Sequence, residues 1–233
     1  MAVVHELKDV VGMFKVGHQL FTAYGPDIVR RITALGCKVF LDLKYHDIPA
    51  TVGKASREAV KLGVSLFNVH ALGGLEMMKA AADAVADSAT KAGVSPPVVL
   101  AVTVLTSMDE QGLRGELKIG RSVPRFVAHL AKMAARSGLD GVVASPQEIS
   151  VLRRAIRGPF VVLTPGVRPD WAAKDDQRRI MTPGEAISAG ADYIVIGRPV
   201  LRSDDRRSAV AKIIAEVDAA KQGIFSDGRA PER

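Results

Sequence analysis

The stretch FLDLKYHDIPAT, residues 40–51, begins as an apolar run and then places Asp42, Lys44 and Asp47 within six positions. Because side chains alternate between the two faces of a strand, Asp42 and Lys44 are predicted to share a face, with Cα atoms roughly 7 Å apart. Lys15 lies at the end of the preceding strand candidate and would lie beside them if the two strands pair. The spacing therefore predicts a row of alternating charges, Lys15, Asp42 and Lys44, where two strands end.

Such a row can do chemistry. Alternating charges stabilise one another against loss of water, so the site can be partly dry while the carboxylate stays ionised and both amines stay protonated. A fixed carboxylate beside a fixed ammonium disfavours an anionic substituent at one point and donates a proton where negative charge then develops. Asp47, in a loop restricted by Pro49, could complete the row or point into a partner subunit. The same charges could instead form a structural ion-pair network that rigidifies the end of the sheet.

A second candidate site lies near the other end of the chain. The motifs TPGVRP (164–169) and VIGRPV (195–200) place Arg168, Gly197 and Arg198 directly after predicted strands. Backbone N–H groups at a helix start, together with a guanidinium, bind phosphate, and barrels carry phosphate sites after their last strands. An ordinary strand-to-helix turn is the alternative. Gln177 belongs to a polar loop that could fold over such a ligand.

Short β-branched runs that alternate with amphipathic stretches must position these residues. Strands are predicted at 13–16, 38–42, 66–70, 98–103, 141–144, 160–164 and 193–196. Between them, apolar residues recur at helical spacing, and a first helix is predicted over 3–11. Two helix starts are marked by a capping box with proline at the first helical position, one at Ser145 to Glu148 and the other at Thr182 to Glu185. Alternating strands and helices predict an α/β fold with parallel pairing.

The positions of the polar residues distinguish a closed parallel barrel from an open parallel sheet. They recur at the carboxyl ends of strands, and no G-x-G-x-x-G follows the first strand, so a (β/α)8 barrel is favoured over an open doubly wound sheet. Only seven strands can be counted. We therefore expect a single barrel domain over residues 1–233 that lacks the first strand of the complete barrel, which would leave a gap in the ring.

Composition narrows the class of protein. The chain has 233 residues without a linker-like stretch, and Cys37 is its only cysteine, which excludes an internal disulfide and fits a reducing compartment. The first ten residues are too charged for a signal peptide and no run is long enough for a membrane span, so a soluble, cytoplasmic protein is expected. Lys plus Arg exceed Asp plus Glu by 32 to 25, but the basic residues are dispersed, which argues against a nucleic-acid partner.

Four motifs in this order, DLKYHDIPAT, VTVLTS, TPGVRP and VIGRPV, resemble those of the orotidine 5'-phosphate decarboxylase family, and the resemblance covers nearly the whole chain. The most specific is D-x-K-x-x-D-I-P-x-T, residues 42–51. The resemblance implies a cofactor-independent and metal-free carboxy-lyase that converts orotidine 5'-phosphate to UMP in pyrimidine biosynthesis. It also implies a homodimer with shared active sites.

The resemblance also implies roles for individual residues. Lys15, Asp42, Lys44 and Asp47 match the catalytic charged tetrad, with Lys44 as the proton donor. Asp47 and Thr51 match residues that reach into the site of the second subunit. The residues implied to bind substrate are Thr106 for the pyrimidine and Arg168, Gln177, Gly197 and Arg198 for the phosphate and its covering loop.

The chain departs from the family pattern at two places. Ala50 stands where the family often has Asn, and there is no counterpart to the family's first apolar strand, which ends in a ribose-binding Asp. Two other functions stay open at this point. One is an Mg²⁺-dependent phosphosugar decarboxylase or aldolase of the same superfamily, although such enzymes lack the HDIP continuation and need a metal-binding acidic residue at a strand end, where this chain offers His70. The other is an inactive, truncated barrel that only binds phosphate.

Overall fold

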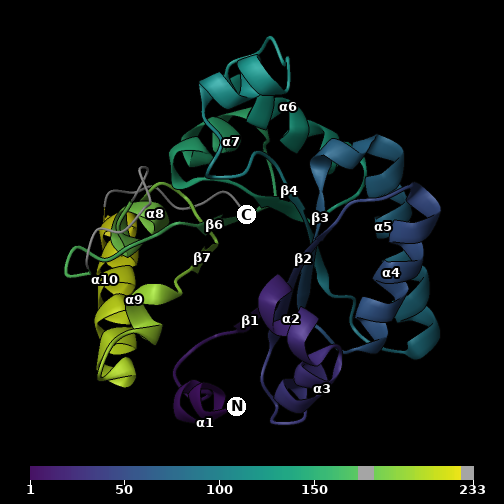
Figure 1. The fold of residues 1–233 in the computed structure, drawn as a ribbon. Coiled ribbons are helices and arrows are strands. Elements are labelled where there is room, and N and C mark those ends of the chain that lie inside the picture. The colour runs from purple at the N-terminus through teal and green to yellow at the C-terminus, as the bar shows by residue number, and fades with distance from the viewer. Residues whose placement is uncertain (173–180, 227–233) are drawn as a thin grey trace. The chain divides into compact units, whose positions relative to one another are not determined.

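The computed structural model describes residues 1–172 and 181–226, and its strands follow one another in chain order (Figure 1). The strands are β1 (Phe14–Gly17), β2 (Val39–Tyr45), β3 (Leu66–His70), β4 (Val98–Val102), β5 (Gly141–Val143), β6 (Val161–Pro165) and β7 (Tyr193–Val195). The pairs β1–β2, β2–β3, β3–β4 and β6–β7 are parallel. The predicted α/β barrel class, with seven strands in the described residues, is confirmed.

Helices follow the strands, as crossovers between parallel strands require. They are α1 (Ala2–Leu7), α2 (His18–Tyr24), α3 (Asp27–Thr33), α4 (Pro49–Lys61), α5 (Gly74–Ala92), α6 (Val123–Arg136), α7 (Ile149–Ala155), α8 (Pro183–Ser188), α9 (Arg198–Leu201) and α10 (Arg206–Ser226). Short turns of other helix types are η1 (Ala71–Gly73), η2 (Gly112–Glu116) and η3 (Pro146–Glu148). Along the described helices, none combines the length and apolar character that crossing a bilayer demands.

Two compact units make up the chain: residues 1–102 with 133–141, and residues 103–132 with 142–233. The first unit contains β1 to β4. Leu41 of β2 and Phe67 of β3 are fully buried. Strands of a parallel sheet are largely apolar on both faces, because other parts of the protein cover both faces of the sheet. Helices α4 and α5 pack side by side, and Gly53 of α4 permits this, since a Cβ there would lie 3.3 Å from the Ala80 carbonyl oxygen (Figure 1).

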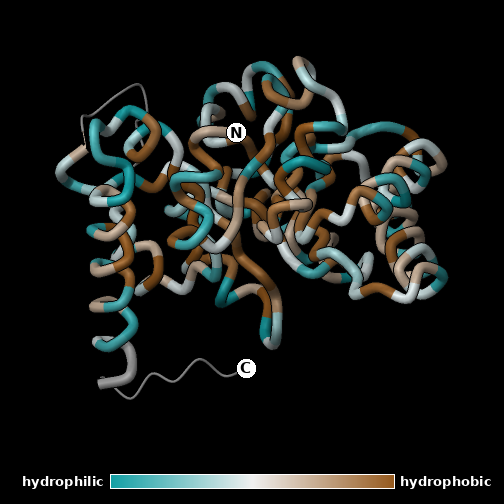
Figure 2. Tube along the Cα trace, turned by 90° about the horizontal axis from the view of Figure 1, so that it is seen from below, coloured by the Kyte–Doolittle hydropathy of each residue, from teal (hydrophilic) through white to brown (hydrophobic). Residues whose placement is uncertain are grey.

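The second unit contains β6, β7 and the helices α8 and α10, which pack against each other. Arg153 of α7 links the segments that precede β6 and β7, because it donates to the carbonyl oxygens of Phe160 and Gly190 and to the Asp192 carboxylate. Apolar and polar segments alternate along the helices in both units, the pattern expected when one face of each helix is buried (Figure 2).

The two predicted capping boxes had different outcomes. At α8 the box is complete, because the Thr182 hydroxyl accepts from the Glu185 N–H and the Glu185 carboxylate accepts from the Thr182 N–H. At Ser145 the predicted helix start with Pro146 at its first position is confirmed, but the capping box is wrong, because the Glu148 N–H donates to the Ser145 carbonyl oxygen instead of the hydroxyl. The Ser145 hydroxyl accepts from the Gln147 N–H at 3.4 Å, because the chain first forms the tighter turn η3 before α7 begins at Ile149.

Candidate active site

Strands β1 and β2 bring the three residues of the predicted charged row together. Gly17 pairs with Asp42 in the parallel register, which places Lys15 on the strand beside Asp42. Lys15 Nζ lies 3.2 Å from Asp42 Oδ2, and Lys44 Nζ lies 2.6 Å from Asp42 Oδ1. One carboxylate is therefore held between two ammonium groups, and we call Lys15, Asp42 and Lys44 the charged row.

Local backbone geometry at Lys44 differs from the regular strand that the sequence predicts. Leu41 of β2 pairs with Phe67 of β3, and Tyr45 pairs with Val69. The four-residue advance along β2 therefore spans only two residues of β3. Lys44 itself has φ of +49°, a left-handed conformation that costs a lysine about 1–3 kcal/mol. A bulge, and not simple alternation along the strand, sets the direction of the Lys44 side chain.

The Asn68 side chain on β3 hydrogen-bonds to two residues of this bulge, Lys44 and Asp42. Its Oδ1 accepts the Lys44 backbone N–H at 2.7 Å, and its Nδ2 donates to Asp42 Oδ1, also at 2.7 Å. The side chain is only 1% exposed. Sequence reasoning missed Asn68, although one signal was present: it is the single amide in the otherwise apolar run LFNV (66–69).

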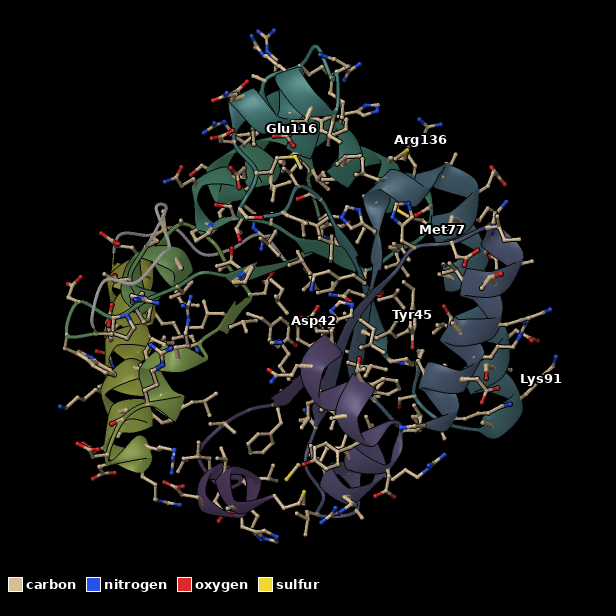
Figure 3. All side chains as sticks on the ribbon, viewed as in Figure 1. Asp42, Tyr45, Met77, Lys91, Glu116 and Arg136 are labelled. Atoms are coloured by element: carbon tan, nitrogen blue, oxygen red, sulfur yellow. The ribbon has the colours of Figure 1, made fainter. Side chains whose placement is uncertain are left out.

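Electrostatics keep the Asp42 carboxylate charged. Burial by itself would raise the pKa of Asp42, but hydrogen bonds from Lys44 and Asn68 and the positive charges of Lys15 and Lys44 outweigh it, so the pKa lies below its ordinary value. In Figure 3 Asp42 and Tyr45 lie on opposite sides of β2, with Tyr45 on the side of α4 and α5, where its ring packs against Phe67. Asp42 thus lies on the face of β2 opposite the one that packs on these helices.

Two histidines lie close to the charged row. The His70 ring, at the end of β3, stacks on His46 with a centroid separation of 5.3 Å, and His70 Nδ1 accepts from the Leu72 N–H. Burial, followed by the positive charges of His46 and Lys44, lowers the pKa of His70 to about 4. His70 is therefore neutral at pH 7. Within residues 1–172 and 181–226, no group of three or more His, Cys, Asp or Glu side chains could hold a metal ion.

Asp47 and Thr51 are not part of the charged row within one chain. The Asp47 carboxylate accepts from the Ile48 backbone N–H at 2.6 Å, and both Asp47 and Thr51 are exposed at the start of α4. Among the described residues, no ion pair joins Asp47 to Lys15 or Lys44. Ile48, between them, is 66% exposed, which is high for an isoleucine.

The remaining predicted site residues belong to the second unit. Thr106 is exposed in the loop after β4, and Arg168 is buried beyond β6, with its backbone N–H donating to the Met181 carbonyl oxygen. Gly197 precedes α9 and Arg198 is the first residue of that helix. Gln177 lies outside the described residues.

Comparison with known proteins gives consistent matches. The sequence model of the orotidine 5'-phosphate decarboxylase / HUMPS family matches residues 1–213. Proteins named orotidine 5'-phosphate decarboxylase are similar to this chain: that of Syntrophotalea carbinolica is 54% identical over 93% of the chain and 88% of the relative, and that of Moorella thermoacetica is 50% identical over 94% and 86%. The crystal structure of orotidine 5'-phosphate decarboxylase from Lactobacillus acidophilus superimposes with a TM-score of 0.78 at 41% identity, covering 87% of this chain and 85% of that one.

Proposed function

Because the chain belongs to the orotidine 5'-phosphate decarboxylase / HUMPS family, we propose that it decarboxylates orotidine 5'-phosphate to UMP in pyrimidine biosynthesis, and that the charged row is its catalytic centre. The observation that carries the proposal is the position of the Asp42 carboxylate between two ammonium groups, at 3.2 and 2.6 Å. These three residues fall in the most specific motif of the family and on the strand beside it.

The reaction places an unusual demand on the protein. Breaking the bond from C6 to the carboxylate carbon releases CO₂ and leaves the electron pair on C6, in an sp² orbital that the ring π system cannot delocalise. Lys44 stabilises this carbanion electrostatically and transfers a proton from Nζ to C6 to complete UMP, after which Nζ regains a proton from water. Asp42 lies beside the departing carboxylate and disfavours its charge before the bond breaks.

A turnover assay with a chelator tests this function. We expect the purified protein to abolish the absorbance that distinguishes orotidine 5'-phosphate from UMP, at a rate that EDTA does not change, since the proposed step needs only protein charges. A turnover that EDTA stops would favour the magnesium-dependent phosphosugar enzymes. A folded protein that binds UMP without turning over orotidine 5'-phosphate would favour the inactive phosphate-binding barrel.

Lys15 holds Asp42 from the other side, and Gly17 leaves room for its ammonium group. A Cβ at Gly17 would lie 2.9 Å from Lys15 Nζ, whereas the backbone at Gly17, with φ of −96°, accepts alanine without strain. Gly17→Ala should therefore displace the flexible end of Lys15 and lower kcat roughly tenfold with an unchanged or higher Tm.

Steady-state kinetics and calorimetry measure this effect. Gly12→Ala is the matched control, because a Cβ there meets nothing within 4 Å. An unchanged kcat in Gly17→Ala would show that the position of the Lys15 ammonium is unimportant for turnover.

We assign the phosphate of the substrate to Arg168, Gly197 and Arg198, with Gln177 in the covering loop, and the pyrimidine contact to Thr106. The support is their match to the family motifs and the position of Arg198 at the first turn of α9. Remote phosphate contacts supply binding energy that holds the base in place during the reaction.

Arg198→Ala should lower kcat/KM for orotidine 5'-phosphate about a hundredfold, because a charge-assisted hydrogen bond to the phosphate is lost. Arg125→Ala, an exposed arginine on α6, serves as the control and should change kcat/KM less than about twofold. Equal losses in both variants would mean that Arg198 contributes only general positive charge.

We further propose a homodimer in which Asp47 and Thr51 act in the partner's active site. Their exposure at the start of α4, beside the exposed Ile48, supports this assignment, because side chains that act in a partner's site must be accessible on the surface of their own chain.

Complementation tests the shared site. Lys44→Ala and Asp47→Ala should each be nearly inactive, but mixed dimers contain one site free of both substitutions, so random reassortment should restore about a quarter of wild-type activity. Activity in the mixture that stays at the level of the separate variants would place Asp47 in the site of its own chain.

A cytoplasmic location completes the proposal. The single cysteine fits a reducing compartment, and both substrate and product are phosphorylated nucleotides, whose charge keeps them on the side of a membrane where they are made.

A further inference from the structure

Asn68 is an amide in the middle of a buried strand, with Phe67 and Val69 fully buried on either side. A buried amide lowers the stability of the fold unless its donors and acceptor form hydrogen bonds. The partners of those hydrogen bonds therefore indicate the role of the side chain. Both of those hydrogen bonds go to the charged row and neither goes to the strand ladder. The orientation of the amide is fixed, because a backbone N–H can only donate and an ionised carboxylate can only accept.

The bond to Lys44 acts on a strained backbone. The bulge in β2 takes the Lys44 N–H out of the regular pairing with β3, and the Asn68 side chain supplies the acceptor at 2.7 Å. A left-handed lysine persists only where the surrounding structure over-determines it. His18 adds to this, since its Nε2 lies 3.1 Å from the Leu43 carbonyl oxygen in the same bulge. Asn68 thereby helps to fix the direction in which the Lys44 side chain leaves the strand.

The bond to Asp42 acts on the carboxylate itself. Asp42 Oδ1 receives both the Asn68 amide at 2.7 Å and Lys44 Nζ at 2.6 Å, while Oδ2 faces Lys15. One side chain from β3 therefore connects the backbone of the proposed proton donor to the carboxylate that pairs with its ammonium. Loss of either bond would free one of the two groups to rotate.

We propose that Asn68 is a positioning residue for decarboxylation, which holds the Lys44 backbone and the Asp42 carboxylate in one fixed arrangement. The role rests on the proposed function of the charged row, and Asn68 acts through these two groups without contacting the substrate. A side chain that only stabilised the fold would change the free energy of unfolding and leave the chemistry of the folded enzyme unaltered.

Two substitutions separate the two bonds. Asn68→Ala removes both, whereas Asn68→Asp keeps an acceptor for the Lys44 N–H but replaces the donor to Asp42 with a negative charge. Leu66→Ala is the control for stability, because Leu66 is buried on the same strand and its side chain forms no hydrogen bond with the charged row. Urea unfolding measures how far each variant is destabilised.

We expect Asn68→Ala to lower kcat about 10- to 100-fold with KM changed less than about threefold, the pattern of a lost supporting contact. The acidic limb of the pH profile should move to higher pH, because the hydrogen bond from Asn68 favours ionised Asp42 and its loss raises the pKa of that carboxyl. Lys15 and Lys44 still face Asp42 in this variant, so the limb moves without disappearing. Asn68→Asp should move it further.

An NMR titration of carboxyl-labelled aspartate, read without substrate, separates this proposal from the function it rests on. Asn68→Ala should raise the pKa of Asp42 and expose the Lys44 amide to hydrogen exchange, while Leu66→Ala should do neither. If the wild type does not turn over orotidine 5'-phosphate, the proposed function fails and the titration still judges Asn68. An unchanged Asp42 titration, or a kcat in Asn68→Ala that matches that of an equally destabilised Leu66→Ala, would overturn the positioning role.

Discussion

Lys44→Ala is expected to lower the turnover of orotidine 5'-phosphate at least about a thousandfold, because it removes the proposed proton donor and its positive charge. The substitution is specific to the side chain. Lysine and alanine meet the same strain at φ of +49°, so the backbone of the bulge is not relieved or worsened by the exchange. Substrate binding through the phosphate should survive, and the loss should therefore fall on kcat.

Single-turnover measurement with saturating substrate gives this loss directly. Lys54→Ala, at an exposed position on α4, is the control for removal of one positive charge and should retain wild-type kcat. Near wild-type turnover in Lys44→Ala would remove Lys44 from the role of proton donor.

Asp42→Asn has the second-largest expected effect. The exchange keeps the shape of the side chain and its acceptor for Asn68, but it leaves two ammonium groups together without the carboxylate between them. We expect kcat to fall about 100- to 1,000-fold, while KM stays the same or decreases, because the charge proposed to oppose the substrate carboxylate is gone. A fall in kcat without a rise in KM separates this role from general loss of structure.

Asp87→Asn is the matched control, because Asp87 makes an exposed ion pair with Lys91 on α5 and lies in the same unit. Exposed pairs of this kind contribute little, so this variant should keep both kcat and stability. If Asp42→Asn unfolded more readily but kept its kcat, the charged row would be a structural ion-pair network.

Periodicity and turn signals located the strands, although not every strand end. The run LFNVH was predicted over 66–70 and forms β3 over the same residues, since apolar runs of this length buried on both faces have few alternative structures. The first helix was predicted to reach Val11 but ends at Leu7, where the N–H groups of Val10 and Val11 both donate to the Leu7 carbonyl oxygen. The two β-branched residues favour this tightened end over another helical turn.

The charged row shows where sequence reasoning stops. The types and order of Lys15, Asp42 and Lys44 were enough to predict that they meet, because parallel strands with a common register bring such positions together. The prediction ended β2 at Asp42, whereas the strand continues to Tyr45 through a bulge. In that bulge the Lys44 N–H donates to a side chain 24 positions away, and periodicity along one strand carries no information about such a contact.

The most direct test of the charged row as catalytic centre is a crystal structure of the protein with UMP, in which the distance from C6 of the pyrimidine to Lys44 Nζ is measured. The proposed proton transfer predicts a separation of about 3–3.5 Å, with the Asp42 carboxylate on the same side of the ring. A nucleotide bound with C6 turned away from Lys44, or bound where neither Lys15 nor Lys44 reaches it, would contradict the account.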